Sequence, residues 1–130
     1  MARKISIGLG LVAAALSLAA IPAASSAHHS FAMFDANKEV TLDGVVREYQ
    51  WQNPHTWTQL TVMENGASTE YAVEGAGSSS LTRKGRTRHD IKAGDHIKLT
   101  IHPLKDGTKG GSFIKAVFPD GKILAEGQGG

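Results

Sequence analysis

The chain has 130 residues, with 14 Lys and Arg against 12 Asp and Glu and no cysteine. This length suits one small domain, and the lack of cysteine excludes disulfides, thiolate metal ligands and thiol nucleophiles. Two of the basic residues, Arg3 and Lys4, precede an uncharged segment, so the remainder of the chain has balanced charge. Such balance argues against nucleic-acid binding, which needs clustered excess positive charge.

Residues 1–27 have the pattern of a secretory signal peptide. The basic start is followed by an uncharged, mostly apolar run from Ile5 to Ile21, and Ser25 and Ala27 occupy the small-residue positions before a cleavage site. We expect cleavage after Ala27 and a periplasmic location. No later segment has the roughly 20 apolar residues that a membrane span requires, so none is expected after cleavage.

The rest of the chain divides into an arm, a domain and a tail. Residues 28–38 are expected to form an N-terminal arm that docks through Phe31, Met33 and Phe34. Residues 39–126 are expected to form one β domain, and the glycine-rich residues 127–130 a disordered tail.

Six segments of the domain alternate apolar and polar residues as strands do. They are residues 39–51, 56–63, 69–74, 96–102, 112–118 and 122–124. In the first segment the apolar parity changes near Gly44, which predicts a glycine bulge. Asn65-Gly66 predicts a hairpin turn after the second segment. In the fourth segment, His96 and His102 fall on the polar face and are expected to face solvent.

The order of these segments predicts the fold class. A long bent strand and two further strands are followed by a short helical link near Ser80 to Arg83 and then by two or three strands. This order suits an all-β, five- to six-stranded OB-like barrel, which closes its sheet edges. A small open β-sandwich is the alternative.

Histidines beside the expected cleavage site suggest a metal site. After cleavage His28 would be the first residue, and its α-amine and imidazole could chelate one ion. Nitrogen ligands in tetragonal geometry suit Cu(II), so a copper ion is the expected cofactor. His55 is the candidate third nitrogen because a rigid Asn-Pro corner precedes it. His29 would be a further ligand or a partner of the ligands, and the Met33 thioether would suit Cu(I).

Two alternatives to this site stay open. Cleavage after Ser26 would place a histidine third in the chain, where amine, backbone and imidazole nitrogens bind Cu(II) or Ni(II) together. The arm histidines could also be merely solvated, and His55 could serve only to cap its turn.

Three aromatic residues support a different function. OB-type barrels bind oligosaccharides and oligonucleotides on aromatic faces, so Trp51, Trp57 and Tyr71 could serve a binding module for a glycan or a periplasmic protein partner. They could equally belong to the core. No GxSxG, HExxH or P-loop pattern is present, so we expect no enzyme activity. The leading hypothesis is a periplasmic, non-catalytic copper-binding protein.

Two segments also resemble a known family. HHSFAMFD at residues 28–35 and WQNPH at residues 51–55 are similar to motifs of a bacterial family of small exported proteins catalogued as a domain of unknown function. The resemblance covers nearly the whole chain after the signal. It implies a periplasmic single domain, draws attention to His28, His29 and His55, and implies no activity.

Overall fold

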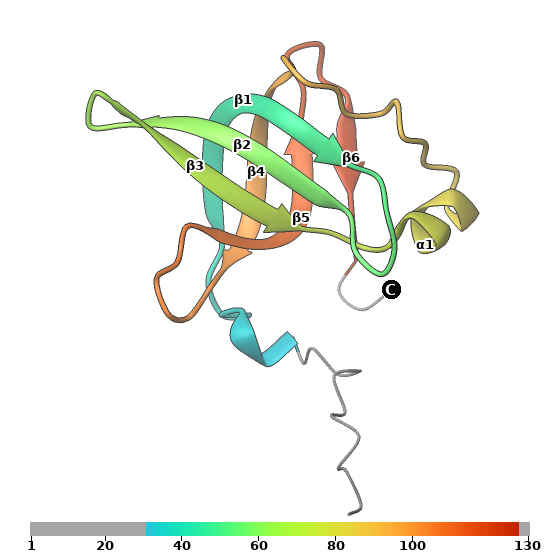
Figure 1. The fold of residues 1–130 in the computed structure, drawn as a ribbon, viewed down its shortest axis with the longest axis horizontal. Coiled ribbons are helices and arrows are strands. Elements are labelled where there is room, and N and C mark those ends of the chain that lie inside the picture. The colour runs from blue at the N-terminus through green and yellow to red at the C-terminus, as the bar shows by residue number, and fades with distance from the viewer. Residues whose placement is uncertain (1–30, 128–130) are drawn as a thin grey trace, which may run out of the picture.

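Six strands and two short helices make up the described part of this computed structural model, residues 31–127 (Figure 1). In chain order they are the 3-10 helix η1 (Phe31–Met33), β1 (Val40–Gln50), β2 (Trp57–Glu64), β3 (Ala67–Glu74), α1 (Ser78–Arg83), β4 (His96–Pro103), β5 (Gly110–Val117) and β6 (Ile123–Ala125). Within these residues, no helix has the length and apolar character to cross a membrane.

Hydrogen bonding closes five of these strands into a barrel. Antiparallel pairing gives the order β3-β2-β1-β4-β5, a parallel pairing joins β3 to β5, and β6 adds to β5 outside the ring. The helix α1 lies in the connection from β3 to β4 (Figure 1). The predicted OB-like barrel is therefore confirmed, and the open sandwich is excluded because the ring closes.

Side chains that alternate along the strands fill the barrel interior. In β2, Leu60 and Val62 are buried, whereas Trp57 lies on the other face. In β3, Val73 is buried and Tyr71 packs against the same core. Each fully buried aliphatic side chain contributes roughly 1.5–3 kcal/mol to stability. The period-two pattern thus correctly predicted which face of these strands lines the core.

The bulge predicted in β1 lies elsewhere. The register with β2 shifts between Val46 and Glu48, and Leu42, Gly44 and Val46 all face the interior. A Cβ on Gly44 would lie 2.6 Å from the carbonyl oxygen of Thr61. Glycine at this position therefore permits a close approach of β2 and does not mark the change of parity.

The strand β5 begins two residues earlier than predicted, at a pair of glycines where the barrel closes. Both Gly110 and Gly111 are buried between β3 and β4. A Cβ on Gly110 would lie 2.3 Å from the carbonyl oxygen of Ala72, and one on Gly111 would lie 2.3 Å from that of His102. These residues have the composition of a loop, but their lack of side chains allows three strands to meet.

The arm covers His102, so the prediction that this side chain faces solvent is wrong. Only 4% of His102 is exposed, and its Nδ1 lies 2.8 Å from the Lys38 carbonyl oxygen. The Phe31 ring contacts the imidazole edge-on at 5.8 Å between centroids, and Phe34 is buried nearby in the arm. His96, on the same strand, is exposed as predicted. The strand pattern identifies an outer face but cannot show what packs on it.

Candidate functional site

His55 lies in the loop between β1 and β2, and its two ring nitrogens have different partners. Nδ1 lies 3.2 Å from the carbonyl oxygen of Gly75, and Nε2 lies 3.1 Å from Oε1 of Glu74. The carbonyl oxygen and the carboxylate oxygen both only accept hydrogen bonds, so each ring nitrogen donates to its partner when it carries a proton. The His55 side chain is 37% exposed and that of Glu74 is 14% exposed. The pair is thus reachable from solvent at the histidine.

A short ladder of hydrogen bonds ties this loop to the end of β3. The Thr56 amide and hydroxyl both donate to the Ala76 carbonyl oxygen, and the Gly75 amide donates to the Thr56 carbonyl oxygen. Asn53, which precedes a cis proline, forms two hydrogen bonds with Ser79 of α1. His55 is therefore held from both sides and does not sit on a free loop.

A buried acid lies behind the ladder. Glu126 is 9% exposed, its Oε2 accepts the Ala76 N–H at 2.8 Å, and Arg86 approaches its Oε1 at 4.0 Å. Burial raises the pKa of Glu126, although the Ala76 hydrogen bond and the Arg86 charge oppose the shift. Burial likewise raises the pKa of Tyr49 to about 12. The Arg86 side chain is only 11% exposed and also pairs with Asp90 at 2.8 Å.

The strand register brings the docked arm close to the His55–Glu74 pair. Glu74 pairs with Ser112 across β3 and β5, and Ser112 pairs with His102 across β5 and β4. Neighbouring strands lie about 4.8 Å apart, so Glu74 and His102 are roughly 10 Å apart on one face. Phe31 packs on His102, and Figure 1 shows the η1 turn below the end of β4.

The predicted metal ligands are only partly described. His28 and His29 lie outside the described residues, as do the expected signal peptide and cleavage site. Met33 is 39% exposed and lies with the turn after β4, where its carbonyl accepts a backbone hydrogen bond. Over residues 31–127, no group of three or more His, Asp or Glu is arranged to hold a metal ion. His55 and Glu74 form a pair only.

The three aromatic candidates do not share one surface. Trp57 pairs directly with Glu74, on the outer face of the sheet. Tyr71 pairs with the fully buried Leu60 and faces the interior. Trp51 follows β1, and its ring lies tilted against that of Tyr49 with 6.0 Å between the ring centroids. The strand register places Trp57 beside Glu74 of the His55–Glu74 pair.

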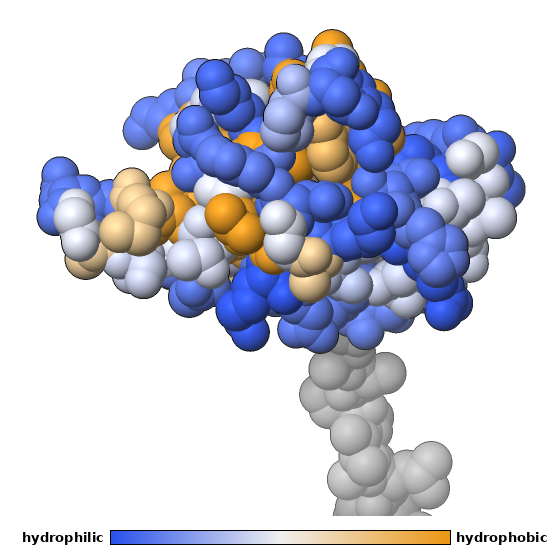
Figure 2. Space-filling view, turned by 90° about the horizontal axis from the view of Figure 1, so that it is seen from above, coloured by the Kyte–Doolittle hydropathy of each residue, from blue (hydrophilic) through white to orange (hydrophobic). Residues whose placement is uncertain are grey.

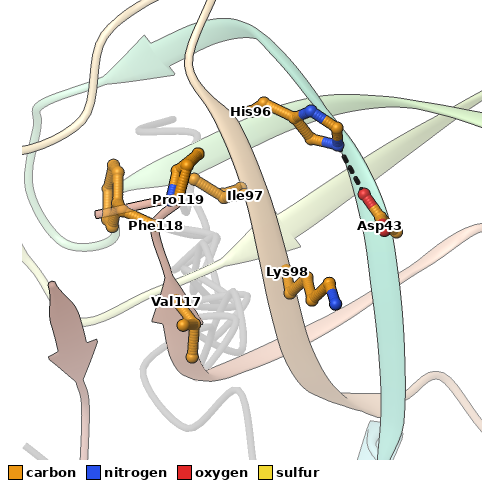
Figure 3. Close-up of a pocket in the computed structure, with 7 residues that line it drawn as sticks. All are labelled: Asp43, His96, Ile97, Lys98, Val117, Phe118 and Pro119. Atoms are coloured by element: carbon orange, nitrogen blue, oxygen red, sulfur yellow. Dashed lines mark hydrogen bonds and ion pairs between the residues drawn. The ribbon is translucent and has the colours of Figure 1, made fainter. Parts of the chain in front are cut away.

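A separate groove lies on the outer surface between β4 and the turn after β5 (Figure 3). It has a volume of ≈ 350 Å³ and is lined by Asp43, His96, Ile97, Lys98, Val117, Phe118 and Pro119. Nε2 of His96 lies 2.5 Å from Oδ1 of Asp43, with the two side chains 62% and 58% exposed. An ion pair so exposed contributes at most about 1 kcal/mol, and the lining offers no third metal ligand.

The surface seen from above is mostly hydrophilic (Figure 2). Hydrophobic residues show in several places between hydrophilic ones, at the upper edge of the molecule as well as toward the middle of this view. Monomeric proteins commonly expose apolar patches of a few hundred Å², so this distribution gives no special evidence of a docking surface.

The chain matches one family model. A model described as a family of unknown function (DUF6152) covers residues 14–113. No curated protein and no solved structure matches the chain. The matched range includes both His55 and Glu74, whereas Glu126 lies beyond it.

Proposed function

The chain belongs to this family of unknown function, DUF6152, and we propose that it is an exported, non-catalytic protein that binds copper in the periplasm. In this proposal residues 1–27 are removed as a signal peptide. His28 then supplies its amine and imidazole, and His55 supplies a third nitrogen through Nε2. Glu74, which the sequence pattern did not single out as a ligand, adds a carboxylate oxygen, and His29 is auxiliary.

The observation that carries the proposal is the 3.1 Å between His55 Nε2 and Glu74 Oε1. Two ligand atoms bound to one ion at about 2.0–2.1 Å lie roughly 2.8–3.4 Å apart when the angle at the metal is about 90–110°. Without a proton on Nε2, two sets of lone pairs would face each other across this gap. A cation therefore fits where a proton otherwise sits.

The partner of the other ring nitrogen supports the same conclusion. Imidazoles that bind metals usually donate their second N–H to a backbone carbonyl or a carboxylate, which fixes the tautomer and the ring orientation. Nδ1 of His55 has such a partner in the Gly75 carbonyl oxygen. The ring is thus oriented with Nε2 toward Glu74, the direction in which it would act as the ligand.

The arm is long enough to complete the site. His28 precedes Phe31 by three residues, and three residues of extended chain span about 10 Å. This length is comparable to the roughly 10 Å that separates His102, on which Phe31 packs, from Glu74. Ligands at the expected amino terminus could therefore reach the pair while the arm stays docked.

A binding module for a glycan or a protein partner is the second candidate. Trp57 on the outer face beside Glu74 favours it, since OB-type barrels bind ligands by stacking on such side chains. Trp51, which packs with Tyr49, and Tyr71, which faces the interior, do not join Trp57 in one aromatic binding surface. The metal-binding function therefore has the stronger support.

Copper titration of the mature protein and its variants tests the proposal. We expect one Cu(II) to be retained at micromolar concentration in native mass spectrometry. His55→Ala and Glu74→Gln should each weaken binding at least tenfold, because each removes a ligand. His96→Ala is the matched control, since this exposed histidine pairs with Asp43 away from the site. Equal losses in His55→Ala and His96→Ala would refute the assignment.

Intact mass and pH dependence test the amino-terminal part separately. Protein purified from a periplasmic extract should have a mass that begins at His28. Binding should weaken between about pH 7.5 and pH 5.5, because the amine and the imidazoles must lose protons to bind. A chain that begins elsewhere, or an affinity that is flat over this range, would exclude the amine–imidazole chelate.

A further inference from the structure

The groove between β4 and the turn after β5 has a charged side and an apolar side (Figure 3). Asp43, His96 and Lys98 line the charged side. Val117 and Pro119 line the apolar side. The strand register places Lys98 directly beside Val117. A small molecule with one charged end and one apolar end would therefore contact both sides at once.

The apolar side continues beyond the groove onto β6. Ile97 and Phe118, which also line the groove, are buried. Ile123 pairs with Val117 across β5 and β6, and it is 60% exposed. The groove volume of ≈ 350 Å³ falls within the roughly 300–1,000 Å³ of small-molecule sites. The surface thus offers an apolar group both room and contact.

The charged side contains a cation that has no partner. Asp43 and Lys98 lie directly opposite each other in the pairing of β1 with β4. The Asp43 carboxylate nevertheless contacts the diagonal neighbour His96, with 2.5 Å between Oδ1 and Nε2 (Figure 3). Within residues 31–127, the Lys98 ammonium has neither an ion-pair nor a hydrogen-bond partner. Because a lysine ammonium has three donors on a flexible stem, Lys98 can turn toward an anion in the groove.

Neighbouring acidic residues do not compete for this ammonium. Asp95 and Asp120 are the acids that lie next to the groove residues in the chain. Oδ2 of Asp95 accepts the backbone N–H of Lys92 at 2.8 Å. Oδ1 of Asp120 accepts the backbone N–H of Lys122 at 2.9 Å. Each carboxylate is therefore already engaged, and Lys98 stays available for an anion from solution.

We propose that this groove binds a small organic anion, namely a carboxylate joined to an apolar group. The carboxylate pairs with the Lys98 ammonium, and the apolar group rests on Val117 and Pro119. Burial of the apolar group supplies most of the affinity, and the single charge fixes the orientation of the ligand. This binding needs no metal and lies apart from His55, so it does not depend on the proposed copper site.

Titration with benzoate, followed by the amide NMR shifts of the protein with a chelator present, tests the proposal. The shifts should concentrate at Lys98 and Val117 and fit one site with a Kd of about 1–10 mM. Benzamide and benzylamine carry the same ring without the negative charge, and each should bind about threefold more weakly or worse. An equal affinity for either of these probes would overturn the proposal, because the groove would then not select an anion.

Lys98→Met tests the charged contact. It removes the ammonium, keeps an unbranched side chain, and should weaken benzoate binding by about threefold to fivefold, as expected for an exposed ion pair. Lys105→Met is the matched control, because it makes the same change in net charge at an exposed residue beyond the far end of β4. It should change the affinity by less than about twofold. Equal losses in the two variants would refute a specific role of Lys98.

Val117→Thr tests the apolar contact. It replaces one methyl by a hydroxyl and should weaken benzoate binding by up to about fourfold, the value of one buried methyl group. An unchanged affinity would refute the contact with the apolar side. Shifts that map to another part of the barrel, or the lack of saturation up to about 50 mM benzoate, would overturn the proposal without any variant.

Discussion

Replacing Gly75 by alanine should disrupt the network behind His55. The added methyl would have to displace Oγ1 of Thr56 and the Glu126 carboxylate, 2.5 and 2.9 Å away. Overpacking of this kind costs about 1–3 kcal/mol. A weakened hydrogen bond from Ala76 N–H to the carboxylate adds about 1.5 kcal/mol, and the lower backbone entropy of unfolded alanine returns about 0.4–1 kcal/mol. We therefore expect the free energy of unfolding to fall by about 1.5–4 kcal/mol.

Urea denaturation followed by tryptophan fluorescence measures this loss. The matched control is Gly127→Ala, because a Cβ on Gly127 meets no atom within 4 Å, and it should change stability by less than about 0.5 kcal/mol. A loss below about 1 kcal/mol for Gly75→Ala would mean that Thr56 and Glu126 move aside without penalty. The Gly75–Ala76 peptide would then not be rigidly held behind His55.

Two further predictions concern Glu126 and the arm. Burial raises the pKa of Glu126 above its usual 4.5, so its contribution to stability is fully present below that value and is lost as the pH rises through the raised pKa. The stability of wild type minus that of Glu126→Gln should accordingly fall from pH 4 toward neutrality in urea titrations, and a constant difference would contradict it. Phe31→Ala should weaken copper binding no more than about threefold, since Phe34 still anchors the arm and the tether only doubles from three to six residues. A loss as large as that of His55→Ala would place Phe31 in the site itself.

Much of the fold followed from local patterns in the sequence. The alternation in β2 and β3 identified the core face, and Asn65-Gly66 predicted the turn between them. Both turn residues have positive φ, at 50° and 80°, as the hairpin turn requires. These features depend on neighbouring residues in one chain segment, which explains why the sequence revealed them.

Features that depend on distant segments were not predictable in the same way. Gly111 resembled a loop residue, yet it is buried because β4 passes within contact of its backbone. His102 lies on the outer face of β4, yet the arm covers it. His55 was a candidate from its Asn-Pro corner, but its proximity to Glu74 arises from the loop meeting the end of β3. No sequence pattern indicated a role for Glu126, because only the folded chain brings this residue, which follows β6, to Ala76.

The proposed copper site has a rigid half and a tethered half. His55 and Glu74 are fixed on the barrel before any ion binds, so their ordering entropy is lost during folding and does not reduce the affinity. Two ligands alone do not complete a tetragonal site, and over residues 31–127 no third is at hand. The remaining nitrogens would have to come from the arm, at an effective concentration set by the short tether to Phe31. The copper affinity should therefore depend both on the barrel, which fixes the ligand geometry, and on the arm, which supplies the remaining ligands. A site built on only one of these two parts would not depend on both.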